Sequence, residues 1–167
     1  VDNAVASVSA GGAVVPVMLE CLYRAPLLIA GNAAHNGTNK VAYSAPSVGG
    51  TPSWLTLSSD GYTITLSEDG IYELSHNTFI ASTSGQRSSV SAKFALGGVV
   101  QVVRPATGYI RLGGNHNESS THIVNYLVER SGSNLLLTVP LGNETSNGAV
   151  NATMAAGEST LTIKKIT

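Results

Sequence analysis

The sequence predicts an all-β fold, an antiparallel β-sandwich or jelly roll, because about ten short strand-like stretches recur at regular spacing. Apolar stretches alternate with turn-forming residues along the chain, and 18 glycines accompany a hydrophobic content of 43%. Helix signals are nearly absent, since only residues 150–156 could wind, and that segment is short and flanked by glycine. No internal repeat is visible, which disfavours solenoids and propellers.

The chain is expected to consist of a lead-in segment and one domain. Residues 1–13 are small and polar, which is typical of a linker, and residues 14–167 have the length of a single domain. The first strand-like stretches of that domain are residues 14–23, 26–30 and 40–44. Cys21 is the only cysteine, so no disulfide forms within the chain, and its apolar neighbours predict a buried thiol.

Three turn signals are each expected to reverse the chain. Asp60-Gly61 separates residues 53–57 from 62–66, and Gly97-Gly98 separates residues 88–96 from 99–103. The segment 130–133 separates two further strand-like stretches in the same way, at residues 121–129 and 134–139. Additional strands are expected at residues 108–112 and 159–166.

The longest alternating stretch, residues 71–81, follows the turn at Asp69-Gly70. Successive side chains of a strand point to opposite faces, so this strand has two sets of side chains. One set is Tyr72, Leu74, His76, Thr78 and Ile80, and the other is Ile71, Glu73, Ser75, Asn77 and Phe79. Both sets contain large apolar groups, which favours a sandwich that also packs against other copies of itself.

The low charge of the chain excludes several classes of function. Only 11% of its residues are charged and the formal net charge is −1, so no basic stripe is present and we expect no nucleic-acid partner. The longest apolar run, residues 13–19, is interrupted by Pro16, so we expect no membrane insertion. A surface with so little charge stays soluble through Ser, Thr, Asn and Gly, or it is partly covered in an oligomer.

The second half of the chain resembles a known family in several blocks. Glu68-Asp69-Gly70-Ile71-Tyr72-Glu73-Leu74 is similar to the turn-Gly-x-Tyr-x-apolar strand of the C1q/TNF-like jelly roll. Three later blocks follow the family in the same order: residues 91–98, residues 122–139 with the turn Ser131-Gly132-Ser133-Asn134, and the closing stretch 156–166. The resemblance extends from about Tyr62 to the C-terminus, and it is closer to the bacterial and phage members, which cap spore-surface filaments and virion spikes or fibres. His76 departs from the pattern by replacing an aromatic residue, and upstream collagen-like repeats are absent.

The resemblance implies a homotrimer with a tightly packed threefold axis. Carried over by position, the residues facing that axis are Ile71, Ser75 and Phe79. The residues implied to fill the core of each protomer are Tyr72, Leu74 and Ile80.

A polar loop near residue 116 contains the candidate binding residues. His116, Glu118 and His122 are metal-capable, although they lack the spacing of a helical zinc motif. Because loops on rigid sandwiches commonly carry recognition, Asn115, His116 and Asn117 are candidates for contact with a receptor. Calcium, which some C1q-like domains bind, is the cofactor to consider, but the acidic residues here are scattered, so we expect no cofactor.

His76 lies on the expected core face of its strand, and two interpretations of it stay open. The first is a buried imidazole satisfied by a backbone carbonyl or a neighbouring hydroxyl. The second is a pH-sensitive packing element that becomes charged near pH 6.

The sequence offers no catalytic motif. It has no G-x-S-x-G sequence, no phosphate-binding glycine loop and no dinucleotide fingerprint. Its only aspartates are Asp2, Asp60 and Asp69, so paired carboxylates for glycoside hydrolysis would have to come from distant loops. We therefore expect no enzyme activity.

Together these observations favour a non-enzymatic, trimeric head domain of a virion spike or fibre. It is expected to lie on the virion surface or outside the cell and to bind a host receptor or glycan. One alternative is a structural module that trimerises and decorates a spore-surface filament or a capsid. Another is a glycan-processing enzyme of a phage spike. The step from fold to function rests on analogy.

Overall fold

The computed structural model describes residues 14–22, 24–29, 33–35, 38–82, 88–102, 106–107, 110, 118–143 and 150–166. The expected lead-in segment, residues 1–13, lies outside these ranges, as do residues 111–117, which include most of the expected polar loop. All strand pairs within the described ranges are antiparallel.

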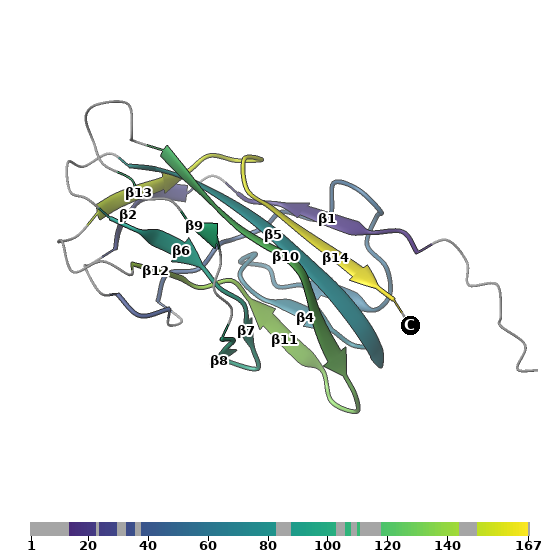
Figure 1. Ribbon diagram of the computed structural model, residues 1–167. Coiled ribbons are helices and arrows are strands. Elements are labelled where there is room, and N and C mark those ends of the chain that lie inside the picture. Colours follow the sequence, from purple (N-terminus) through teal and green to yellow (C-terminus); the bar gives the residue numbers. More distant parts are fainter. Residues whose placement is uncertain are drawn as a thin grey trace, which may run out of the picture.

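The first layer of the fold is a seven-stranded sheet. Its main path is β1 (Val17–Glu20), β14 (Thr160–Lys165), β5 (Gly70–Ser82), β10 (Glu118–Arg130) and β9 (Ala106–Thr107). Off this path, β13 (Val150–Met154) pairs with both β5 and β2 (Arg24–Ile29). Figure 1 shows β5, β10 and β14 running side by side along the molecule.

The second layer is a five-stranded sheet supplemented by a two-stranded one. The order of the five is β3 (Leu55–Leu57), β4 (Ile64–Leu66), β11 (Leu135–Thr138), β7 (Ala95–Leu96) and β8 (Val99–Val100). The pair is β12 (Leu141–Asn143) with β6 (Val90–Ala92). The part of the chain that the structure describes contains no helix, so the expected antiparallel sandwich is confirmed.

The core lies between the layers and is built from alternate residues of the strands. β5 shows the pattern over its whole length, because buried and half-buried residues alternate from Tyr72 to Ser82. Tyr72 and Leu74 have no exposed surface and Ile80 is 1% exposed, so these three side chains lie in the core of the protomer. Cys21 is buried as expected, and its thiol donates a hydrogen bond to the Ala155 carbonyl oxygen at 2.9 Å.

Two of the expected hairpins are confirmed. β3 pairs with β4 around Asp60-Gly61, and β7 pairs with β8 around Gly97-Gly98. Gly61 needs its lack of a side chain, because its φ is +74° and a Cβ there would lie 2.5 Å from the Tyr43 carbonyl oxygen. The conformation of such a turn depends on its own few residues, so both hairpins could be predicted from short stretches of sequence.

The third reversal does not form the expected strand pair. β10 and β11 follow one another around residues 131–134, but β10 pairs with β5 and β9 while β11 pairs with β4 and β7. The turn therefore carries the chain from one sheet to the other. Arg130 holds the crossing, because its guanidinium donates to Asp69 Oδ1 at 2.6 Å and to the Gly132 and Ser133 carbonyl oxygens.

The segment with the one helix signal of the sequence, residues 150–156, forms a strand instead. Val150–Met154 forms β13, which pairs with β2 and with the end of β5. Its weak helix signal is overridden because two neighbouring strands offer backbone partners. Among the described residues, no helix is long and apolar enough to span a membrane.

Candidate functional site

The outer surface of β5 and β10 carries exposed apolar side chains, and we call it the β5–β10 face. On β5 it consists of Ile71, Glu73, Ser75, Asn77 and Phe79, which alternate with the core residues. On β10 it includes Val124, which is 71% exposed, and Leu127, which is 58% exposed. Ile71 is 39% exposed, whereas Ser75 and Phe79 are half-buried.

A β-bulge in β10 shapes this face. The register with β5 shifts between Ile123, which is opposite His76, and Tyr126, which is opposite Leu74. Asn125 adopts a φ of +53° there, and its backbone N–H donates to Ser75 Oγ at 3.1 Å. The bulge leaves Val124 exposed on this face, where the Ser75 hydroxyl is already bonded within the protomer.

Sequence reasoning missed Val124 and Leu127, although a signal for the bulge was present. Ile123 and Val124 are consecutive apolar residues, and the following asparagine tolerates a left-handed conformation. Such a break in the alternation within a long strand is typical of a bulge.

The candidate metal ligands do not come together in the described residues. Glu118 and His122 lie on β10 itself, both exposed, and residues four apart on a strand are separated by about 13 Å. His122 is instead within hydrogen-bond distance of the Ser120 hydroxyl, with Nε2 and Oγ 3.0 Å apart. His116 lies outside the described residues, as do Asn115 and Asn117. Within the described ranges, no three His, Cys, Asp or Glu side chains are grouped to hold a metal ion.

His76 forms a buried polar cluster with two hydroxyl groups. Its Nε2 lies 2.7 Å from the Tyr43 hydroxyl, its Nδ1 lies 2.8 Å from the Thr78 hydroxyl, and its ring packs edge-on near Phe94. Burial is the main cause that lowers the pKa of His76 from 6.5 to about 3, and the nearby His122 adds to the effect. The interpretation as an imidazole satisfied by hydroxyls is confirmed. The alternative, a group that becomes charged near pH 6, is wrong because the core disfavours the charged form.

One serine–histidine contact has the geometry of a nucleophile and its base. His35 Nε2 and Ser91 Oγ are 2.8 Å apart. Ser91 has no exposed surface, however, so a substrate carbonyl could not reach its hydroxyl. The contact serves to hold the His35 ring in place.

No protein-family model and no curated protein matches the sequence. The fold is nevertheless similar to solved structures of TNF-family proteins. A structure of murine APRIL at pH 5.0 aligns with a TM-score of 0.53 and 11% identity, over 90% of this chain and 99% of that chain. The Eiger TNF from S. frugiperda aligns with a TM-score of 0.50 and 11% identity, over 92% of this chain and 93% of that chain. At such identities the similarity shows the fold, and it confirms the TNF-like jelly roll that the sequence resemblance implied.

Proposed function

We propose that this protein is a non-enzymatic binding domain that works as a homotrimer, with three copies in contact through the β5–β10 face. The observation that carries the proposal is the apolar exposure of that face, above all at Val124 and Leu127. A soluble domain seldom leaves such residues together on a flat sheet unless a partner covers them. In the trimer we place Ile71, Ser75 and Phe79 nearest the threefold axis.

Burial of the apolar side chains on this face would contribute favourable free energy to association. Fully burying one valine, leucine or isoleucine side chain contributes about 1.5–3 kcal/mol. Each copy offers Ile71, Val124 and Leu127, all more than one-third exposed in the single chain. The same face also carries charged groups: Glu73 lies opposite Lys164, and the exposed Glu129 lies opposite Ile71. Their desolvation would offset part of this gain.

We further propose that the trimer is the head domain of a virion spike or fibre, located on the virion surface or outside the cell, where it binds a host receptor or glycan. The support is the TNF-like fold together with the sequence blocks that resemble phage members of that fold. We assign receptor contact to Asn115, His116 and Asn117, which directly precede the first residue of β10. We expect this contact at the end of the sandwich where β10 begins, because loops on rigid sandwiches commonly carry recognition.

The oligomeric state is tested by light scattering after size-exclusion chromatography. The wild-type protein is expected to have about three times the 17.1 kDa mass of one chain. The double variant Val124→Asp, Leu127→Asp should give single subunits that keep their β-sheet circular dichroism, since both positions are exposed in the single chain. The matched control is Val99→Asp on β8 of the other sheet, 67% exposed, which should remain a trimer. A wild-type protein with the mass of one chain would contradict the proposal.

The binding role is tested separately, with the wild-type trimer on an array of cell-surface glycans and on intact host cells. Replacement of Asn115, His116 and Asn117 by alanine should abolish attachment and leave the trimer intact. A trimer that attaches to no surface would favour the alternative function, decoration of a spore filament or capsid. Release of reducing ends from a surface polysaccharide would instead indicate an enzyme.

A further inference from the structure

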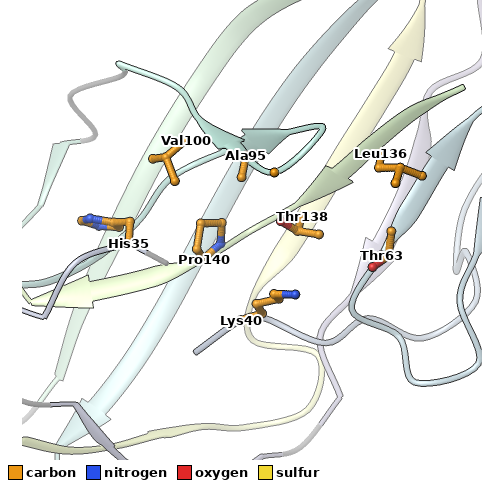
Figure 2. Close-up of a pocket in the computed structure, with 9 residues that line it drawn as sticks. His35, Lys40, Thr63, Ala95, Val100, Leu136, Thr138 and Pro140 are labelled. Carbon is orange, nitrogen blue, oxygen red and sulfur yellow. The ribbon is translucent and has the colours of Figure 1, made fainter. Parts of the chain in front are cut away.

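A cavity of about 450 Å³ opens on the outer surface of the five-stranded sheet, on the opposite layer from the β5–β10 face. This volume falls within the range of pockets that hold small organic ligands. Figure 2 shows the residues around it, with the Lys40 side chain pointing toward the side where Thr63 and Thr138 lie.

The floor of the cavity follows from strand register. Thr138 of β11 is opposite Ala95 of β7, and Ala95 is opposite Val100 of β8, so their side chains share the outer surface of the sheet. Thr63, next to Ile64 of β4, continues the same row on the other side of β11. Because this row contains short side chains, it leaves a depression beside the larger Leu136.

The walls of the cavity are fixed by contacts within the protein. Lys40 forms an antiparallel bridge with Pro140, and hydrogen bonds from Val41 N–H to the Val139 carbonyl and from Leu141 N–H to the Asn39 carbonyl flank it. On the far side, the Ser91 hydroxyl contacts the His35 ring. The ring also lies over Gly142, where a Cβ would come within 2.6 Å of His35 Nδ1. A pocket with anchored walls exists before a ligand arrives, which reduces the entropy cost of binding.

The described lining of the cavity carries one positively charged side chain. Lys40 contributes this cation, and none of the lining residues that the structure describes is acidic. Asp60 is near enough for Lys40 to help lower its pKa, after larger contributions from hydrogen bonds to Ser58 and Tyr62. Those two bonds, at 2.6 and 3.1 Å, hold the Asp60 carboxylate in its own turn.

We propose that this cavity binds a monosaccharide that carries a carboxylate. Lys40 pairs with the carboxylate, the hydroxyls of Thr63 and Thr138 bond to sugar hydroxyls, and Leu136 and Val100 contact the C–H surface of the ring. A simple inorganic anion would leave most of the cavity and its apolar lining unused. The proposal concerns a different surface from the proposed trimer contact and from the proposed receptor loop, so each can fail alone.

The test is a ligand titration followed by NMR, with the methyl glycosides of glucuronate, galacturonate and N-acetylneuraminate as probes. Methyl glucoside and methyl galactoside, which lack the carboxylate, are the neutral controls for the two uronates. We expect at least one acidic sugar to bind. For a uronate, the neutral counterpart should bind about tenfold more weakly, because a charge-assisted hydrogen bond is lost.

Three variants assign the binding to this cavity. Lys40→Gln should weaken binding of the acidic sugar about tenfold and remove the preference over its neutral counterpart. Thr138→Val, which keeps the shape of the side chain, should weaken binding of both the acidic sugar and its neutral counterpart. Lys164→Gln on β14 of the other sheet is the charge-matched control, and it should leave the affinity for both sugars unchanged. Thermal melts show that each variant is folded.

Two results would overturn the proposal. One is the absence of binding by all three acidic sugars to the folded wild-type protein. The other is undiminished binding of an acidic sugar by a folded Lys40→Gln variant. Unchanged binding in the trimer-disrupting variant Val124→Asp, Leu127→Asp would support the location of the site in a single protomer.

Discussion

Replacing His76 with glutamine is expected to remove a large part of the acid sensitivity of this fold. His76 is 2% exposed and is bonded to the hydroxyls of Tyr43 and Thr78 between the two sheets. Burial holds its pKa at about 3 in the folded protein, against 6.5 for an exposed histidine. Between these two pH values, His76 is therefore protonated in the unfolded chain but not in the folded chain.

The sign and size of the effect follow from this difference. The stabilising contribution is complete above pH 6.5 and is lost as the pH falls toward 3. Each pH unit in that window costs about 1.4 kcal/mol. Between pH 7.5 and 5, where few carboxylates titrate, the wild-type protein should lose about 2 kcal/mol of unfolding free energy through His76 alone.

The measurement is urea unfolding at pH 7.5, 6.5, 5.8 and 5.0, at one fixed protein concentration. The His76→Gln variant should be less stable than the wild type at pH 7.5, but its unfolding free energy should vary with pH by about 2 kcal/mol less over this range. His122→Gln is the matched control, since His122 is exposed on the neighbouring strand, and it should keep the wild-type pH dependence. Equal pH slopes for the wild type and His76→Gln would refute the reasoning.

Two further predictions concern stability. Arg130→Gln should lower the free energy of unfolding by about 1–3 kcal/mol, and Asp69→Asn by less than about 1 kcal/mol. The reason is that the Arg130 side chain is 7% exposed and bonds two backbone carbonyls, whereas the Asp69 side chain is 67% exposed. Equal losses for the two variants in urea unfolding would contradict this. Gly61→Ala should cost at least about 1 kcal/mol more than Gly50→Ala. Both glycines have positive φ, but only at Gly61 would the new Cβ meet the Tyr43 carbonyl, and thermal melts that shift equally would argue against this contact.

Much of the fold was predictable from the sequence because its signals are local. Alternation along β5 separated the side chains of Tyr72, Leu74 and Ile80 from those of the opposite face, and these three are buried. The turns at Asp60-Gly61 and Gly97-Gly98 gave two hairpins, since a glycine with positive φ closes a turn wherever the flanking strands lead.

The candidate surfaces were less predictable. The alternation of β5 indicated a second, half-buried face, but the exposure of Val124 depends on a bulge whose Asn125 bonds to Ser75, 50 residues earlier. The metal candidates were assigned to one loop, whereas β10 already begins at Glu118 and places His122 farther along the strand.

By itself, the sequence determined the fold class, the core side of the longest strand and the positions of the tight turns, because each depends on residues within a few positions of one another. The tertiary structure decided which strands share a sheet. Asp69 lies where the chain passes from β4 to β5, and Arg130 lies where it passes from β10 to β11, so their contact across 61 residues joins two crossings between the layers. It also formed the cavity, where Lys40 and Thr138 meet although nearly a hundred residues separate them. Such partners are chosen by the packing of whole strands against one another, and no short stretch of sequence contains that information.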